Sequence, residues 1–215
     1  LREAGSGGSL VTLLCDRGER YEDTVLDRAW LGAHGVDLDP WLDALRTTAP
    51  EIWAQTDGRI DGFTCAVGTG GTLTGTGMGL KEFNPDLVLA LTDPEGAALY
   101  NWFAHGELRA EGNSVSEGIG QSRITANLEG LTVDTQFRVP DTEALGYVHD
   151  LQQHEGLCLG LSSGINVAGA VRLAREMGPG KTIVTILCDS GLRYLSTIYN
   201  PAWCAAKGLP APPWL

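Results

Sequence analysis

The sequence predicts an α/β fold, in which a mostly parallel sheet lies between two layers of helices. From residue 47 onward, short runs rich in Val, Ile, Leu and Phe alternate with longer helix-forming segments, as in successive βα units. Glycine-rich turns follow two of these runs where the next helix is expected to begin. At 215 residues, of which 43% are hydrophobic, the chain is also long enough to bury such a core.

The first expected strand belongs to a segment that occurs twice. The stretch LVTLLCDRGERY (10–21) returns near the end of the chain as IVTILCDSGLRY (183–194). Two copies around a long unrepeated middle do not make a solenoid, which needs at least about three adjacent repeats. Each copy predicts a buried strand, a turn with Asp and Gly, and a short helix. The strands are residues 10–14 and 182–187, and the helices end at Gly35 and Gly208.

The remaining elements lie between the two copies. Thr48 is the expected N-cap of a helix with Pro50 in its first turn, and Asp141 is the expected N-cap of a later helix. An irregular segment is expected at 106–123. The expected strands are residues 61–67, 87–92, 136–139 and 157–160. The expected helices after the one at Thr48 are residues 72–83, 96–104, 142–154 and 164–177.

The charge of the chain argues against anionic partners. Its formal net charge is −12 and its three lysines, Lys81, Lys181 and Lys207, are scattered. A nucleic acid or an acidic membrane surface is bound by clustered Lys and Arg, so we expect neither as a partner.

The cysteines and the apolar segments suggest a location. The five cysteines form no C-x-x-C pair and no short Cys/His spacing, so we expect no metal site. No signal-peptide pattern opens the sequence, and no apolar stretch reaches the roughly 18 residues of a membrane helix. We therefore expect the chain in the reducing cytoplasm.

A glycine-rich loop is the strongest candidate for a binding site. It follows an apolar strand and opens a helix, so its backbone N–H groups and the positive end of the helix dipole face the same space. Glycines let an anion approach the backbone closely, and threonines add hydroxyl donors. This predicts a phosphate-binding cup, although a tight βα turn also uses small residues. The cup consists of Gly68, Thr69, Gly70, Gly71 and Thr72.

The phosphate compound is not fixed by this loop alone. A dinucleotide fingerprint needs G-x-G-x-x-G and an acidic residue about 20 positions later. Gly68 and Gly70 fit and Asp93 lies at a plausible distance, but Leu73 occupies the place of the third glycine. A Walker A loop is excluded because no Gly-Lys-Ser/Thr follows.

A second glycine-containing turn, GLSSG at 160–164, matches the G-x-S-x-G pattern of a hydrolase nucleophile. In that fold the catalytic His follows the Ser, whereas all four histidines of this chain precede Ser162. Ser162 is better interpreted as a hydroxyl at the carboxyl end of a strand, where open α/β sheets bind ligands.

Five stretches together resemble the C-terminal half of the cysteine synthase family. They occur in the family's order within residues 47–215 and include EGIGQSRITANLEG (117–130) and GLCLGLSSGINVAGAVRLA (156–174). The resemblance implies the large-domain portion of a fold type II enzyme that uses pyridoxal phosphate. The other three stretches are GTGGTLTG (68–75), VPDTEALGYV (139–148) and IVTILCDSGLRY (183–194).

The resemblance also implies roles for individual residues. The cup at 68–72 would hold the cofactor's phosphate, and Ser162 would hydrogen-bond the pyridine nitrogen. Asp189 would lie near the nitrogen edge of the ring, and Gly118 in a loop on the substrate side. The family reaction is the conversion of O-acetylserine and sulfide to cysteine and acetate. A homodimer is a further expectation.

The lysine that bears the cofactor in this family has no counterpart here, because none of the three lysines matches its motif. Residues 1–46 instead resemble the tail of a second, divergent cysteine synthase. We therefore expect a cysteine synthase-like protein that does not catalyse the full reaction alone. A non-catalytic cofactor-binding module and a nicotinamide-dinucleotide domain remain alternatives.

The repeat raises a question of folding, because both copies of the strand could seek the same edge of the sheet. We expect residues 182–187 to take the native place, since the helix that precedes them is present. Residues 10–14 would then pack on a vacant surface or on another chain.

Overall fold

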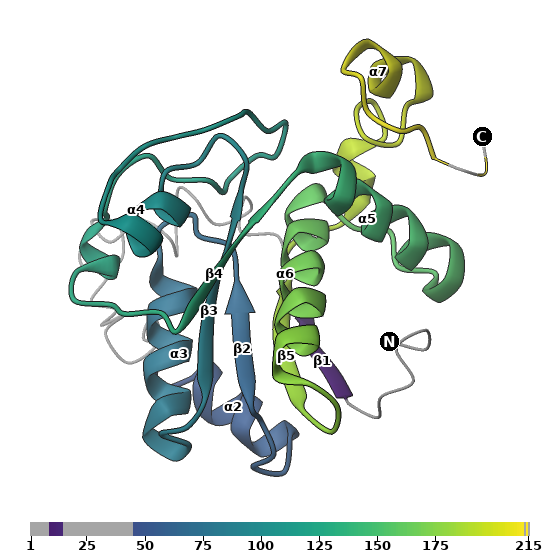
Figure 1. Cartoon of the computed structure of the whole chain (residues 1–215). Helices are drawn as coiled ribbons and strands as arrows, with labels where there is room; N and C mark the ends of the chain where they lie inside the picture. The colour runs from purple at the N-terminus through teal and green to yellow at the C-terminus, as the bar shows by residue number, and fades with distance from the viewer. Residues whose placement is uncertain (1–8, 15–44, 213, 215) are drawn as a thin grey trace, which may run out of the picture.

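One parallel sheet forms the centre of the molecule. The computed structural model describes residues 9–14, 45–212 and 214. Within them the strands lie in the order β1-β5-β2-β3-β4, and every pairing is parallel (Figure 1). The α/β class is confirmed. The strands are β1 (Ser9–Leu14), β2 (Gly62–Cys65), β3 (Val88–Pro94), β4 (Thr135–Val139) and β5 (Thr182–Leu187).

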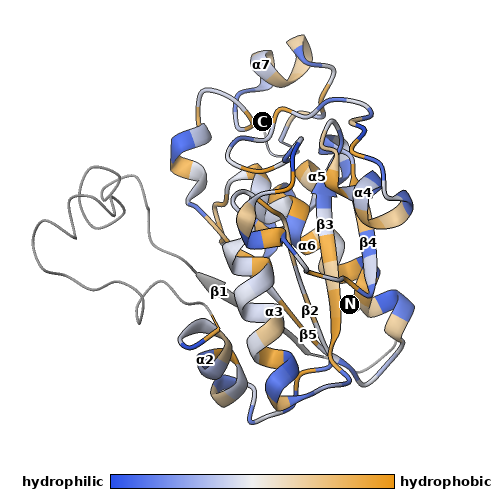
Figure 2. Cartoon of the chain, turned by 90° about the vertical axis from the view of Figure 1, so that its left-hand side faces the viewer, coloured by the Kyte–Doolittle hydropathy of each residue, from blue (hydrophilic) through white to orange (hydrophobic). Residues whose placement is uncertain are grey.

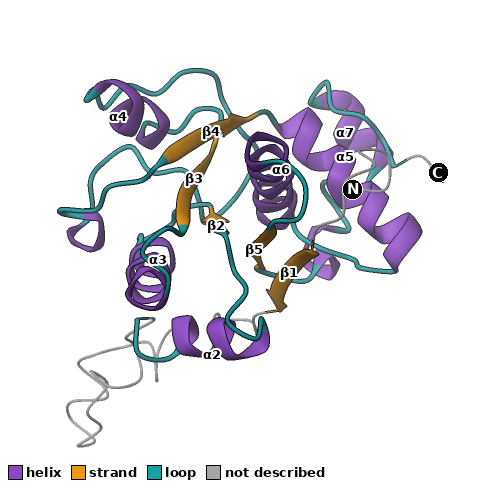
Figure 3. Ribbon diagram, turned by 60° about the horizontal axis from the view of Figure 1, so that its bottom comes forward, coloured by secondary structure: helices purple, strands orange, loops and turns teal. Residues whose placement is uncertain are grey.

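Helices cover both faces of the sheet, and Figure 3 shows α3 and α6 on opposite sides of it. One face carries α2 (Thr48–Gln55), α3 (Gly71–Phe83) and α4 (Leu99–His105). The other carries α5 (Asp141–Glu155) and α6 (Leu161–Met177). The short α7 (Pro201–Ala206) lies at the top of Figure 1, above α5 and α6.

Two hydrophobic cores follow from the alternation of side chains along each strand. In β3, Leu89 and Leu91 pack with α2 and α3, whereas Ala90 between them packs with α5 and α6. In β5, Ile183 and Val184 divide in the same way. Because both faces are covered, the central strands carry apolar residues on both faces, and Figure 2 shows β3 orange along its lower part and blue near its carboxyl end.

Small residues let α6 lie close to the sheet. A Cβ added to Gly169 would collide with the side chain of Thr92 on β3, and one added to Gly164 would collide with the Ala144 carbonyl of α5. The sheet surface beneath α6 is polar at its centre, where Thr64 Oγ1 and Thr92 Oγ1 are 2.7 Å apart. Each hydroxyl is buried but hydrogen-bonded, so this polar strip costs little.

The two copies of the repeated strand lie side by side. β5 occupies the interior between β2 and β1, and β1 forms the edge. The two strands do not compete for one position in the sheet, since β1 pairs with the outer edge of β5. The pairing has the register of the repeat itself, from Leu10 with Ile183 to Leu14 with Leu187. The turn at Asp16 and the helix ending at Gly35 lie outside the described residues.

Most expected elements are present within one to three residues of their expected bounds, but 157–160 is not a strand. It forms only an isolated antiparallel bridge, Leu159 with Ser190, because the chain there pairs with the turn after β5. α6 begins at Leu161, three residues before the expected start.

Neither predicted N-cap acts as a cap. Thr48 is already helical, and the preceding Thr47 makes no side-chain capping bond. Asp141 is the first residue of α5, and its carboxylate accepts hydrogen bonds from Ser114 Oγ at 2.5 Å and Val115 N at 2.7 Å instead. Groups distant in the sequence therefore bind the Asp141 carboxylate, and the amides of the first turn of α5 do not.

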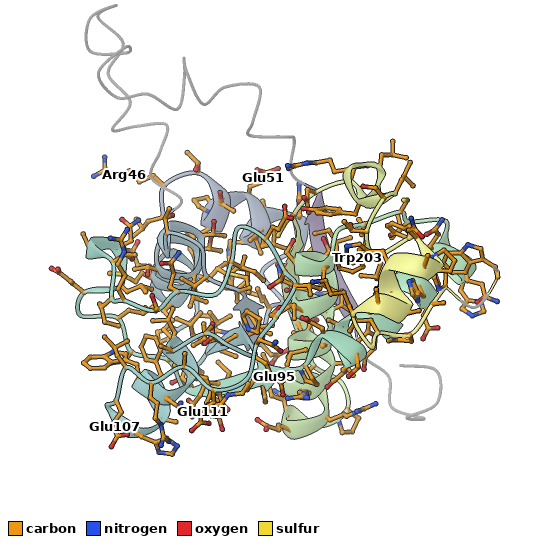
Figure 4. The ribbon with its side chains drawn as sticks, turned by 90° about the horizontal axis from the view of Figure 1, so that it is seen from above. Arg46, Glu51, Glu95, Glu107, Glu111 and Trp203 are labelled. Atoms are coloured by element: carbon orange, nitrogen blue, oxygen red, sulfur yellow. The ribbon has the colours of Figure 1, made fainter. Side chains whose placement is uncertain are left out.

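The irregular segment 106–123 was expected, and it has neither helix nor strand. It is nevertheless tied to the ordered framework. Gly96 N donates to Glu111 O at 2.7 Å and Ala98 N to Gln121 O at 2.9 Å. Figure 4 shows Glu95 and Glu111 on the same side of the molecule. These bonds return the segment to the carboxyl end of β3.

Two searches of the described residues returned nothing. No helix there is long and apolar enough to cross a membrane. No three His, Cys, Asp or Glu side chains in that part of the chain gather where they could hold a metal ion.

Replacing Ser9–Leu14 by a Gly/Ser segment of equal length should increase self-association. The replacement leaves the outer edge of β5 without its partner strand, and an open apolar edge pairs with other chains. Light scattering after size exclusion would show a larger high-mass fraction than in the wild type. An unchanged fraction would mean that β1 does not protect this edge.

Candidate functional site

The order of the strands marks one place where a ligand is expected. From β2 the chain moves outward to β3 and β4, and then returns to place β5 on the other side of β2. Open α/β sheets bind ligands at the carboxyl ends of the strands where the order reverses in this way. Here that point lies between β2 and β5. The glycine-rich cup follows β2, and Asp189 follows β5.

The cup has the geometry of an anion site. Gly70 flanks α3 with a φ of +91°, a conformation that favours glycine, and a Cβ there would strike Leu128. The first amides of the 13-residue helix that follows have no acceptor within the helix. Thr125 Oγ1 and Asn127 Nδ2 both donate to Thr69 O, at 2.7 and 3.1 Å, which fixes the loop from outside.

The threonine hydroxyls of the cup are accessible. Thr69 and Thr72 are both exposed, in contrast to the buried Gly70 between them. A phosphate at this helix terminus would therefore be within reach of both backbone N–H groups and threonine hydroxyls. Both are hydrogen-bond donors of the kind that binds phosphate.

The loop around Gly118 lies against the cup. A Cβ added to Gly68 would meet Gly118 O at 2.7 Å, so the two backbones approach too closely for a side chain. Gly120 N donates to Val67 O at 3.0 Å, which extends this contact to the last residue before the cup. The predicted substrate-side loop and the predicted phosphate loop are thus direct neighbours.

Ser162 and Asp189 are brought together at the same end of the sheet. Ser162 Oγ donates to Asp189 Oδ1 at 3.3 Å, and Tyr194 OH donates to Asp189 Oδ2 at 2.6 Å. Burial, together with the neighbouring Asp189 carboxylate, raises the pKa of Tyr194, so that its hydroxyl keeps its proton. The Arg193 guanidinium lies 3.8 Å from the same carboxylate.

An open cavity of about 360 Å³ connects these groups. Gly118, Ser162 and Asp189 all line it, as sequence reasoning placed them at one ligand. The sequence analysis did not assign a role to five further lining residues. Cys188, Arg193 and Tyr194 stand in the repeated stretch, whose other copy has the same residue types, and Glu117 and Ile119 flank Gly118. The five are Glu117, Ile119, Cys188, Arg193 and Tyr194.

None of the three lysines lines this cavity. Lys81 is in the last turn of α3, at the opposite end from the cup, and pairs with Asp134 at 2.7 Å. Lys181 precedes β5, at the far end of the sheet, and pairs with Asp61 at 2.9 Å. Lys207 Nζ lies 5.9 Å from the centre of the Trp203 ring, beyond α7. The site therefore has donors for an anion but no amine beside them.

Asp93, the acidic residue of the dinucleotide alternative, is not directed toward the cup. It is fully buried, and its Oδ2 accepts from the Tyr100 amide at 2.8 Å at the start of α4. Its Oδ1 has no hydrogen-bond partner in the described structure. This carboxylate is not available to a ribose hydroxyl.

Comparison with known proteins identifies the family of the chain. A family model described as "Pyridoxal-phosphate dependent enzyme" matches residues 16–189. The chain belongs to this family. Its members use pyridoxal phosphate, whose phosphate suits the cup, so the residues present fit the family cofactor. The match begins within the part of the chain that we interpret as a second tail.

Several relatives of the chain are cysteine synthases. The chain is 44% identical over 166 residues to "Cysteine synthase" of Dictyostelium discoideum, which covers 73% of this chain and 44% of the relative. It is 44% identical over 170 residues to "Cysteine synthase 1" of Neurospora crassa, covering 77% and 45%. For "Cysteine synthase A" of Escherichia coli the identity is 40% over 155 residues, covering 71% and 48%. The chain spans less than half the length of these three relatives.

A solved structure supports the same family. The crystal structure of the O-acetylserine dependent cystathionine beta-synthase from Helicobacter pylori superposes with a TM-score of 0.66 at 28% identity. The match covers 86% of this chain and 62% of that one. The fold type II expectation is confirmed by this likeness.

The buried Asp93 predicts a pH-dependent stability. Burial raises its pKa to about 7, against the opposing effect of the Tyr100 and Leu99 amides and of Arg138. The folded state therefore binds the proton more tightly than the unfolded state. The stability due to this proton is fully present below about pH 4 and is lost as the pH rises through about 7.

Asp93→Asn should remove this dependence, because Asn keeps an acceptor for the Tyr100 amide and does not ionise. We expect the free energy of unfolding of the variant, minus that of the wild type, to rise by roughly 1 to 3 kcal/mol between about pH 4 and about pH 8. Urea unfolding at both pH values measures it. A difference that does not vary with pH would show that the carboxyl is not buried as described.

Proposed function

We propose that this chain forms the cofactor-phosphate side of a cysteine synthase-like site, and that the complete site converts O-acetylserine and sulfide to cysteine and acetate. The observation that carries the proposal is the cavity where β2 and β5 diverge, lined by Gly118, Ser162 and Asp189 beside the cup. The cysteine synthase relatives support the reaction. Homodimer assembly remains a prediction.

The cup would bind the phosphate of pyridoxal phosphate. The first amides of α3 and the hydroxyls of Thr69 and Thr72 supply its donors, and the helix dipole favours the negative charge. Asp189, which lines the cavity after β5, offers a carboxylate in place of such donors. The chain thereby orients the ligand, with its phosphate at the cup.

Ser162 would meet the nitrogen of the cofactor ring, and Asp189 would lie beside it. The Ser162 hydroxyl, which donates to Asp189 in this structure, would turn its proton to the ring nitrogen, because an unprotonated pyridine nitrogen can only accept a hydrogen bond. Tyr194 fixes the other oxygen of Asp189, so the carboxylate keeps its orientation. When bound, pyridoxal phosphate supplies an electron sink for negative charge at the α-carbon of an amino-acid substrate.

The proton transfer at the substrate is not supplied by this chain alone. A lysine amine normally does this work in the family that the sequence resembles, and none of the three lysines here lines the cavity. We therefore propose that the chain by itself binds the cofactor without a covalent bond and does not form cysteine. The same observation favours the second candidate function, a non-catalytic cofactor-binding module.

Borohydride reduction in the presence of pyridoxal phosphate should leave the lysines unmodified. We expect saturable binding that inorganic phosphate competes away, with no stoichiometric pyridoxyl adduct by peptide mass spectrometry and no cysteine from O-acetylserine and sulfide. A specific adduct on Lys81, Lys181 or Lys207 together with cysteine formation would contradict the proposal. Tight binding of NADH in place of pyridoxal phosphate would favour the dinucleotide alternative.

Thr72→Val should weaken the binding of pyridoxal phosphate by about tenfold, because it removes a hydroxyl donor to a charged group. Thr76→Val is the matched control, since Thr76 lies further along α3 with a buried hydroxyl that has no hydrogen-bond partner among the described residues. The control should bind as the wild type does. Fluorescence titration measures both, and equal affinities for the two variants would remove Thr72 from the cup.

A further inference from the structure

The backbone pairing between β2 and β5 stops before the strands reach the site. Two residue pairs are formed, Gly62 with Ile183 and Phe63 with Val184, although β5 continues to Leu187. β2 and β3, by contrast, stay paired up to Cys65 and Leu91. β2 and β5 therefore separate toward their carboxyl ends, and the backbone groups in the gap need other partners.

Asn166 of α6 supplies these partners at the open end of the gap. Its Oδ1 accepts a hydrogen bond from Ala66 N at 2.6 Å, and its Nδ2 donates to Ile186 O at 2.8 Å. The side chain is buried, with 1% of the residue exposed. One amide group thus joins the end of β2 to the end of β5, because it can accept from an N–H and donate to a carbonyl at once.

Two neighbouring side chains make hydrogen bonds at other positions along the same gap. Thr185 Oγ1 donates to Thr64 O at 2.6 Å, nearer the middle of the sheet. Ser163 Oγ accepts from Cys188 N at 3.0 Å, on the β5 side only. Among these contacts, only those of Asn166 join the last residues before the cup to the last residues before Asp189.

We infer that Asn166 is a positioning residue, which sets the distance between the phosphate cup and the Ser162–Asp189 pair. Ala66 stands just before the cup and Ile186 just before Cys188 and Asp189. A change in the separation of Ala66 and Ile186 moves the two sides of the site relative to each other. The inference rests on the proposed function, in which one ligand contacts both sides.

Two ligands of different reach test the inference. Pyridoxal phosphate would contact the cup and Ser162, whereas inorganic phosphate would contact the cup alone. We expect Asn166→Ala to weaken the binding of pyridoxal phosphate by at least about tenfold and that of inorganic phosphate by less than about twofold. Calorimetry gives both dissociation constants. Equal weakening of both ligands, or of neither, would overturn the inference.

Thr185→Val is the matched control. It removes the buried hydrogen bond to Thr64 O and a longer one, at 3.5 Å, to the Asn166 carbonyl, and it leaves both hydrogen bonds of the Asn166 side chain to Ala66 and Ile186 in place. The variant should unfold at a lower temperature, with the ratio of the two dissociation constants unchanged. A ratio changed as much as in Asn166→Ala would assign the spacing to β2–β5 contacts in general, and the specific role of Asn166 would be lost.

Amide exchange supplies a readout without ligand. In Asn166→Ala the Ala66 amide should exchange faster, while the amides of β3 keep their protection. Unchanged protection of Ala66 would overturn the inference. If the wild type binds neither ligand, the proposed function fails and the exchange result still decides the role of Asn166. If the Ala variant does not fold, Asn166→Ser replaces it in both measurements.

Discussion

The close packing of α6 against the sheet is the constraint on which the site depends. The helix reaches the sheet because Gly169 carries no side chain where Thr92 stands, and it lies close to α5 because Gly164 carries none where the Ala144 carbonyl stands. Only at this distance can Asn166 and Ser163 contact the backbone of β2 and β5. A bulkier residue at Gly169 would push α6 away from the sheet, and one at Gly164, two residues after Ser162, would push the start of α6 away from α5.

Beneath α6, polar side chains of the sheet form the transition between the apolar core and the binding site. Thr64, Thr92 and Thr185 continue the hydrogen bonding of the sheet through side chains where helix and strands are closest. Each buried hydroxyl has a backbone or hydroxyl partner, so the strip adds specificity of position at little energetic cost. This strip of threonines extends along the strands toward the gap between β2 and β5.

The fold was predictable because alternating strands and helices leave few arrangements. The cup and Ser162 could be named from local motifs, and Gly118 and Asp189 from the resemblance to a known family. Other features depend on contacts between residues far apart in the sequence. The strand expected at 157–160 became a single bridge because its partner is the turn at Ser190. The Asp141 carboxylate accepts hydrogen bonds from Ser114 and Val115 and does not cap its own helix. Similarly, the sequence around Asn166 does not indicate its role, because that role depends on the separation of β2 from β5 beside α6.

The pairing of β1 with β5 joins two versions of one peptide, LVTLL and IVTIL, in matching register. A strand that is copied from its neighbour arrives with the same spacing of branched and small residues, and with the same alternation between faces. A sheet can therefore become wider by duplication without any new sequence having to be selected for fit. In this chain the same pattern occurs both as a repeat along the sequence and as two neighbouring strands of the sheet.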